Sequence, residues 1–296
     1  MKYICYNWMP TIADHILDIP EKFYKDAGTS RLHDIDNFNP YAVRDDDLIF
    51  VKTDFVINGH FFTNFLDKIY CRFNLITGVS SYNIGRDGGD SYKKILNHPN
   101  LIKWICTNPP EEKSDKIVPI PIGFQEPDRP GGNQDLLEQI QQQRTPFDEK
   151  EDGIFLPYHD LTTNPDRAQL FQALSKLPFV HAQTQKQDLI EYYTSLDKYK
   201  FVIGLEGRGP DIHRNYETLL VGAVPISIKN VIQHVFELHQ VGGVFLNNWG
   251  ELDNNLFNSL TETSYNIARN DAFLTLEKHV SHVKGMLKKE QLLNEI

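Results

Sequence analysis

This chain of 296 residues has few cysteines and lacks basic clusters and long apolar runs. Each of these features excludes a class of protein or of binding site. Cys5, Cys71 and Cys106 are an odd number without CxxC spacing, which argues against a disulfide framework and a zinc site. They lie in or beside apolar runs, which favours buried thiols in a reducing compartment. No apolar run approaches the ~18–20 residues of a membrane span, and residues 1–10 lack the apolar segment of a signal peptide. We therefore expect a cytoplasmic protein without a membrane span.

The charge distribution disfavours nucleic acid and anionic membranes as partners. The formal net charge is -10, and no run of Lys and Arg forms a basic patch. Two common nucleotide motifs are missing as well. The turn at residues 206–212 cannot supply the third glycine of GxGxxG, and no Gly-Lys-Ser/Thr of a P-loop occurs there. A nicotinamide-dependent oxidoreductase would suit the fold class described next, but its fingerprint is lacking.

Short β-branched runs alternate with helical patterns along the chain, which predicts parallel sheets with helices on both faces. Strands are expected at residues 3–6, 47–56, 73–79, 102–106, 117–120, 154–158, 201–205, 224–228 and 244–246. Helices are expected at residues 61–70, 92–96, 165–177, 189–196 and 215–221, and helical pattern continues from 260 to the end. A loop is expected at residues 80–90, which are rich in Ser, Asn, Gly and Asp. A stretch rich in Pro, Gly and Gln at 125–152 interrupts this rhythm, and we interpret it as an inter-domain linker with a short polar helix.

Residues 200–226 carry the most informative pattern. An apolar strand leads into Gly207-Arg208-Gly209, a turn that lets the backbone approach a ligand closely. The helix that follows carries Arg214 and Glu217 three residues apart, on one face. Free N–H groups at its start and two guanidinium groups suit diphosphate oxygens, and the carboxylate could accept hydrogen bonds from ribose hydroxyls. Together these groups could bind a nucleoside diphosphate.

The same pattern also has an ordinary structural explanation. Strand, glycine turn and helix follow one another in many α/β proteins. Arg and Glu at i and i+3 are usually a surface ion pair that contributes about 0.2–0.5 kcal/mol. The residue types and their spacing therefore leave both interpretations open.

The matching positions in this segment are Phe201, Val202, Ile203, Gly207, Arg208, Gly209, Asp211, His213, Arg214, Glu217, Leu219, Leu220, Gly222, Pro225 and Ile226. Together they resemble the signature of exostosin-like glycosyltransferases: an apolar strand, a Gly-x-Gly turn, an Asp, an Arg, a Glu and an ending with a small residue and Pro. Weaker similarity extends to residues 104–108 and 117–123, and to residues 162–164 with Arg167. The chain is also similar to short, anchor-free forms from large algal viruses that build capsid glycans.

The resemblance implies an α/β fold of two Rossmann-like domains facing across a cleft, the GT-B type, with a C-terminal helical tract. Residues 1–125 would form the acceptor domain, 126–152 the linker and 153–260 the nucleotide-sugar domain, and helices in 261–296 would cross back to the N-terminal domain. Family enzymes invert the anomeric centre and generally need no metal. The implied donor is a UDP-sugar, with UDP-xylose as the best guess, and the acceptor is a glycan or glycoprotein. For a viral protein the compartment would be the host cytoplasm.

The resemblance also assigns roles within the donor site. Arg208 and Arg214 would bind the diphosphate and Glu217 the ribose. Asn164 and Arg167 would face the same phosphates from a neighbouring loop, while Glu206 and Asp211 would shape the turn or contact the sugar. The backbone of Gly207 and Gly209, together with His213, completes the substrate-binding set. No residue is assigned to a metal.

The general base that inversion requires is the weakest part of this assignment. The family often shows His-Asn-Ser-Asp after the third N-terminal strand, where this chain reads Gly78-Val79-Ser80-Ser81. Asp87 and Asp90 follow that strand at the carboxyl end where open sheets bind ligands, and they are our candidates. The other candidates are Asp14, His15, Asp54 and His60. Each of these six, taken alone, also fits a solvated or capping residue, so a non-catalytic two-lobed sugar- or nucleotide-binding protein stays an alternative.

Overall fold

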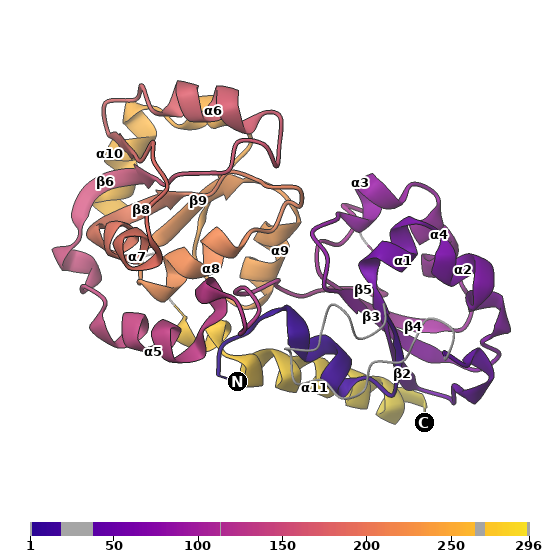
Figure 1. Cartoon of the computed structure of the whole chain (residues 1–296). Helices are drawn as coiled ribbons and strands as arrows, with labels where there is room; N and C mark the ends of the chain where they lie inside the picture. The colour runs from indigo at the N-terminus through magenta and orange to yellow at the C-terminus, as the bar shows by residue number, and fades with distance from the viewer. Residues whose placement is uncertain (1, 19–37, 113, 264–269, 295–296) are drawn as a thin grey trace. The chain divides into compact units, whose positions relative to one another are not determined.

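The computed structural model describes residues 2–18, 38–112, 114–263 and 270–294 (Figure 1). The chain forms two compact units. Unit 1 contains residues 1–122, 126–128 and 275–296, and unit 2 contains residues 123–125 and 129–274. Each unit has one five-stranded parallel sheet with helices, which confirms the α/β class. Of the C-terminal range 261–296, residues 264–269 and 295–296 lie outside the described residues.

The sheet of unit 1 follows chain order, β1-β2-β3-β4-β5, and every neighbouring pair is parallel. Its strands are β1 (His15–Leu17), β2 (Asp47–Lys52), β3 (Phe73–Gly78), β4 (Leu101–Cys106) and β5 (Ile117–Pro119). The strand expected at residues 3–6 is wrong: Tyr3 forms an isolated bridge with Thr275, Cys5 is likewise a single bridge residue, and η1 (Tyr6–Ile12) follows directly. The first strand is instead β1, which has only three residues and therefore little periodicity to detect.

Two apolar layers cover this sheet because its strands are buried on both faces. Ile49 and Val51 of β2 point into one layer, and Leu48 and Phe50 point into the other. The first layer is closed by α1 (Thr53–Ile57), α2 (His60–Asn64), α3 (Ile84–Gly88) and α4 (Ser91–Leu96), with η4 (Pro40–Ala42) and η5 (Leu66–Lys68) beside them. The second is closed by η1 and by α11 (Leu276–Asn294), whose Val283 is fully buried. Residues 275–296 thus pack as part of unit 1.

The sheet of unit 2 has the order β10-β9-β8-β6-β7 and is also fully parallel. Its strands are β6 (Glu151–Leu156), β7 (Val180–Ala182), β8 (Tyr199–Ile203), β9 (Val224–Ile228) and β10 (Val244–Leu246). The first strand of this unit, β6, has β7 on one side and β8 on the other, so the direction of strand addition reverses between β6 and β8. Open α/β sheets bind ligands outside the carboxyl ends of the strands at such a switch point.

Helices cover both faces of this second sheet. Residues of α6 (Arg167–Leu174) and α10 (Asn254–Thr263) share one apolar layer with the strands. Figure 1 shows α7 (Leu189–Lys198) and α8 (His213–Leu220) on the opposite face. The remaining elements are η6 (Pro130–Gly132), α5 (Gln134–Gln143), η7 (Phe147–Glu149), α9 (Val231–Leu238), η8 (Trp249–Glu251) and η10 (Asp271–Leu274).

Most of the predicted linker, residues 125–152, belongs to unit 2. The short polar helix expected there is α5, which packs against α8. The Lys150 ammonium is fully buried and donates to the carboxylate of Asp197 at the end of α7, at 2.5 Å. Thr145 donates to the same carboxylate through its backbone N–H and its hydroxyl. Residues 129–152 are therefore tied to the second sheet and its helices.

Candidate functional site

The switch point between β6 and β8 brings two loops together at the carboxyl edge of the unit 2 sheet. The loop after β6 runs from Pro157 to α6, and the loop after β8 runs from Gly204 to α8. The residue before α8 is Ile212, which supplies no side-chain cap. An uncapped helix start leaves backbone N–H groups and the positive end of the helix dipole available to an anion.

Arg167 and Asn164 hold the loop after β8 in place. The guanidinium of Arg167, in a residue only 9% exposed, donates to the carbonyl oxygens of Glu206 (2.7 Å), Leu205 (2.9 Å) and Asp160 (2.9 Å), and to the Thr163 hydroxyl (2.6 Å). The Asn164 amide donates to the carbonyl oxygens of Glu206 (3.3 Å) and Gly207 (3.2 Å). Asn164 thus uses both amide N–H groups on loop carbonyls, and Arg167 uses four of its five N–H groups on protein oxygens, so both predicted phosphate ligands are mainly engaged with the protein.

His159 joins the ends of β6 and β8 and is neutral. It is 3% exposed, and its Nε2 accepts the Leu205 N–H at 3.3 Å. The ring proton must then be on Nδ1, which donates to the Pro157 carbonyl oxygen at 2.7 Å. Burial, followed by the positive charges of Arg214 and Arg167, lowers the pKa of His159 to about 2. His159 therefore has a structural role, holding the two loop ends together, and does not transfer protons near neutral pH.

Arg214 and Glu217 lie in the first two turns of α8, and the side chain of Tyr192 from α7 contacts both. The guanidinium carbon of Arg214 is 4.7 Å from the centroid of the Tyr192 ring, and its Nη2 donates to the Tyr158 carbonyl oxygen at 3.2 Å. The Tyr192 hydroxyl donates to Oε2 of Glu217 at 2.5 Å. Within the part of the chain that the structure describes, the buried Nη1 of Arg214 has no hydrogen-bond partner.

This arrangement differs from the ordinary surface ion pair. Glu217 is 7% exposed, and among the described residues it forms no salt bridge with Arg214. The carboxylate bonds the tyrosine hydroxyl while the guanidinium lies over the ring. The two charges are therefore held separately, each with hydrogen-bonding capacity left for a ligand.

The other predicted donor-site residues have different surroundings. The Asp211 carboxylate is 5% exposed and accepts the Tyr216 hydroxyl at 2.6 Å, which fixes the start of α8. Glu206 accepts from the Asn230 amide at 2.6 Å, and the His213 Nδ1 lies 2.8 Å from the Gly123 carbonyl oxygen. Arg208 is exposed and Gly209 is buried. A Cβ on Gly207 would lie 3.2 Å from Nη2 of Arg167, so the glycine here accommodates a protein side chain.

The predicted donor-site residues therefore gather on two loops and one helix of unit 2, and two contributors were missed. Tyr192 lies 25 residues before its partner Glu217, too far for any local spacing to reveal. His159 follows β6, where a histidine after a buried strand is a weak signal. Tyr192 is half-buried and bonds Glu217, and His159 is buried and bonds the residue before Glu206. Only the tertiary structure displays these contacts.

Asp87 and Asp90, the candidate bases, have local partners in unit 1. Residues 80–90 include α3, so the expected loop is partly helical. Oδ2 of Asp87 accepts the Asn83 N–H at 2.8 Å, and the Asn83 side chain in turn accepts the Arg86 N–H at 2.7 Å. The Asp90 side chain is 93% exposed and lies 4.0 Å from the Lys93 ammonium. The first carboxylate caps a helix start and the second is solvated.

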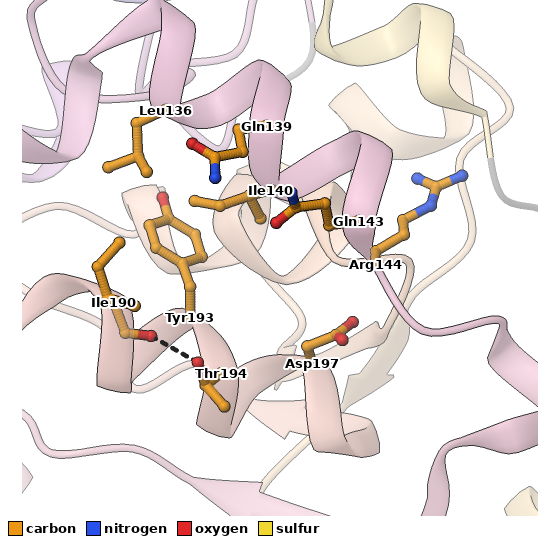
Figure 2. A pocket seen from close by; sticks show the side chains of 9 residues that line it. All are labelled: Leu136, Gln139, Ile140, Gln143, Arg144, Ile190, Tyr193, Thr194 and Asp197. Carbon is orange, nitrogen blue, oxygen red and sulfur yellow. Dashed lines mark hydrogen bonds between the residues drawn. The ribbon is translucent and has the colours of Figure 1, made fainter.

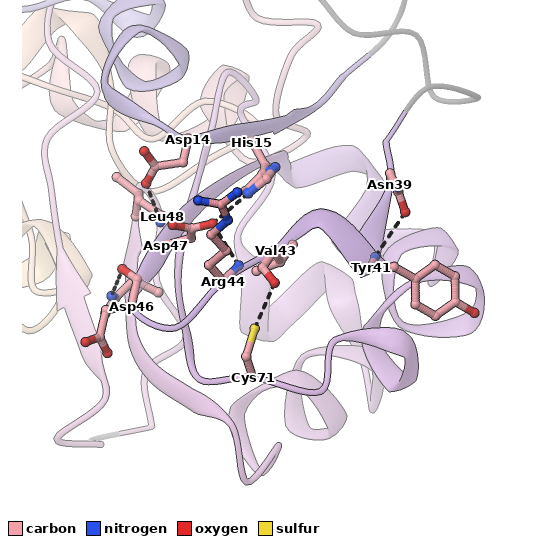
Figure 3. Close-up of polar contacts among 11 residues, drawn as sticks. Asp14, His15, Asn39, Tyr41, Val43, Arg44, Asp46, Asp47, Leu48 and Cys71 are labelled. Atoms are coloured by element: carbon pink, nitrogen blue, oxygen red, sulfur yellow. Dashed lines mark hydrogen bonds and ion pairs between the residues drawn. The ribbon is translucent and has the colours of Figure 1, made fainter.

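Of the other four candidates, His60 begins α2, with its Nδ1 3.1 Å from the Asn64 amide and its buried Nε2 without a hydrogen-bond partner among the described residues. The remaining three divide by their position on the unit 1 sheet. Asp14 and His15 lie at the amino ends of β1 and β2, where Asp14 accepts the Leu48 N–H (2.9 Å) and His15 bonds Asp47 (2.8 Å), as Figure 3 shows. Ligands of open sheets bind at the opposite edge. Asp54 lies on that carboxyl edge, two residues after β2, and its buried Oδ2 has no hydrogen-bond partner among the described residues.

The same edge of unit 1 carries unusual backbone. Val79, directly after β3, has φ 57°, and Asn108, shortly after β4, has φ 46°. A β-branched residue in this region is uncommon and costs about 1–3 kcal/mol. Asp46, directly before β2 at the opposite edge, also has positive φ (68°), but Asp and Asn adopt this region more readily than Val. Strained conformations cluster at functional sites, so the strain at Val79 makes the carboxyl edge a candidate ligand-binding edge of unit 1.

A separate cavity of about 200 Å³ lies between α5 and α7 (Figure 2). Its lining residues include Tyr193, which is next in sequence to Tyr192, together with Arg144 and Asp197. None of the predicted site residues lines this cavity.

Among the described residues, no group of three or more His, Cys, Asp or Glu could hold a metal ion. The described helices include none that is both long and apolar enough to cross a membrane. The chain matches no protein-family model and has no significant match to a curated protein.

Proposed function

We propose that this protein is an inverting glycosyltransferase that transfers a sugar from a nucleotide-sugar to a glycan or glycoprotein. In this proposal the two units are the lobes of a GT-B enzyme, and unit 2 binds the donor. A UDP-sugar is the proposed donor, with UDP-xylose the first to test, as the exostosin-like resemblance implies. No metal is needed.

One observation carries the proposal: the separate placement of Arg214 and Glu217 beside the uncapped start of α8. Both side chains lie at the switch point of a parallel sheet, where α/β folds bind ligands. The buried Nη1 of Arg214 is a donor without a partner among the described residues, and such donors are rare in folded proteins. A diphosphate oxygen would satisfy it, and ribose hydroxyls would satisfy the remaining oxygen of Glu217.

The contacts of the other predicted residues refine their proposed roles. Arg208, exposed on the turn, would join Arg214 on the diphosphate. Arg167 and Asn164 would act through the loop carbonyls that they bind, keeping the loop in shape for the ligand. The cationic groups and the helix start would stabilise the negative charge that develops on the leaving diphosphate.

Inversion proceeds by one displacement. The acceptor hydroxyl oxygen attacks the anomeric carbon, the bond from that carbon to the phosphate oxygen breaks, and its electron pair leaves with the diphosphate. A base takes the hydroxyl proton. Asp54 suits this role better than Asp87, whose carboxylate caps α3, because Asp54 has a buried oxygen free of partners among the described residues.

Thermal-shift screening of the full chain against nucleotides and nucleotide-sugars tests the donor class. A ligand that binds only the folded state raises the melting temperature by mass action. We expect UDP and a UDP-sugar to raise it, and Arg214→Ala and Glu217→Ala to abolish both the shift and sugar transfer while the fold is kept. Full donor affinity and turnover in both variants would show that the site is elsewhere.

A non-catalytic nucleotide- or sugar-binding protein is the second candidate. It is favoured by the local contacts of Asp87 and the solvation of Asp90, which leave the predicted bases without an evident catalytic role. Mass spectrometry of donor and acceptor mixtures separates the candidates, because any donor hydrolysis or transfer by the pure protein excludes a purely binding function.

A further inference from the structure

Tyr192 is the side chain that connects the two charged residues of the donor site. Its ring face supports the Arg214 guanidinium at 4.7 Å, and its hydroxyl donates to Oε2 of Glu217 at 2.5 Å. A cation within about 6 Å of an aromatic centroid is attracted by the ring quadrupole. A hydrogen bond to a carboxylate is shorter and stronger than one between neutral groups. One residue thus makes a favourable contact with each charge.

The contacts with Tyr192 also determine which atoms of Arg214 and Glu217 are left to bind a ligand. Arg214 and Glu217 are three residues apart on α8, a spacing at which opposite charges normally pair. Tyr192 engages both groups, and they form no salt bridge with each other among the described residues. With Oε2 bonded to the tyrosine, Oε1 of Glu217 is the oxygen left to accept from a ligand, and Nη1 of Arg214 is the donor left to bind one.

We propose that Tyr192 is a positioning residue that keeps Arg214 and Glu217 apart and aims them at the diphosphate and at the ribose hydroxyls of one nucleotide. The inference rests on the proposed function, because it concerns the same donor site. Its two halves are separable: the hydroxyl orients the ribose-binding carboxylate, and the ring orients the diphosphate-binding guanidinium. Each half can be removed by a different substitution.

The neighbouring tyrosine provides a matched control. Tyr193 is 3% exposed on the same helix, its ring centroid is 5.2 Å from that of Tyr192, and its hydroxyl has no hydrogen-bond partner among the described residues. Tyr193→Phe removes the same atom from nearly the same place without breaking a bond to Glu217.

Isothermal titration calorimetry of the full chain with UDP, 2′,3′-dideoxy-UDP and inorganic pyrophosphate tests both halves. We expect the wild type to prefer UDP over its dideoxy analogue. Tyr192→Phe should reduce this preference roughly ten-fold with pyrophosphate affinity unchanged. Tyr192→Leu should in addition weaken pyrophosphate binding about two- to five-fold. Tyr193→Phe should change neither quantity by more than about two-fold, since no bond to Glu217 is lost.

Two results would overturn the positioning role alone. One is a Tyr192→Phe variant that keeps the full ribose preference. The other is a variant that weakens UDP and the dideoxy analogue equally, as a merely structural residue would. If the wild type binds neither UDP nor pyrophosphate, the proposed function fails together with this inference.

Discussion

Substitution of Arg167 distinguishes two possible roles of this residue. The family resemblance implies that it binds phosphate, whereas its contacts in the structure indicate that it anchors the loop after β8. The structure shows four hydrogen bonds from this guanidinium, two of them to the carbonyl oxygens of Leu205 and Glu206. A buried carbonyl that loses its partner costs about 1–3 kcal/mol. Allowing water to reach part of the site, we expect Arg167→Ala to lower the free energy of unfolding by about 2–4 kcal/mol.

Urea unfolding measures this loss as a lower midpoint with an unchanged m value. In a unit of about 150 residues, the loss corresponds to a fall in melting temperature of roughly 4–16 °C. Arg214→Ala is the control substitution. Arg214 has one hydrogen bond and one ring contact, so its loss should lower the free energy of unfolding by about 1 kcal/mol or less. The reasoning is refuted if Arg167→Ala unfolds at the wild-type midpoint but loses nucleotide affinity, since the side chain would then be a ligand contact.

Three further predictions concern other parts of the chain. Asp197→Ala leaves the buried Lys150 ammonium without its carboxylate and should lower the free energy of unfolding, measured in urea, by about 3–5 kcal/mol. Asp152→Ala removes the carboxylate of an exposed ion pair and should lower it by less than about 1 kcal/mol. Equal losses in the two variants would contradict this prediction. The pKa of His159 is about 2 when folded and 6.5 in its ordinary state, so the unfolded chain binds the extra proton. Stability should therefore fall as pH drops below 6.5, by at most about 1.4 kcal/mol per unit from this group, and His159→Gln should remove that slope; an unchanged slope is the adverse result. Asp54→Asn should lower kcat at least about 100-fold without raising the donor KM, while Asp87→Asn changes kcat only a few-fold; the reverse order would assign the base to Asp87.

Much of the fold was predictable because its strands are buried apolar runs. All six residues of β3 are buried, and the predicted strand at 73–79 differs from it by one residue. Length alone did not decide which strands could be predicted, because the three-residue strands β5 and β10 were predicted whereas β1 and β7, equally short, were missed. The two missed strands each contain a histidine, which interrupts the apolar run that marks a buried strand. The helix α3 was hidden within a Ser-, Asn- and Gly-rich stretch, where the Asn83 cap that begins it is also a turn signal.

The candidate site could be predicted only where its residues are close together in the sequence. Arg214 and Glu217 share a helix, so their common face followed from the sequence. Their separation depends on Tyr192, which comes from another helix and could not be paired with them in advance. Similarly, an arginine beside a glycine turn can bind either a phosphate or the turn itself, and only the tertiary structure shows the Arg167 donors on loop carbonyls.

A crystal structure of the protein with UDP tests the central claim most directly. We predict that the diphosphate lies at the start of α8 within hydrogen-bond distance of the Arg214 guanidinium, and that the ribose hydroxyls contact the Glu217 carboxylate. A nucleotide bound elsewhere, or these two side chains turned away from it into solvent, would contradict the proposed donor site.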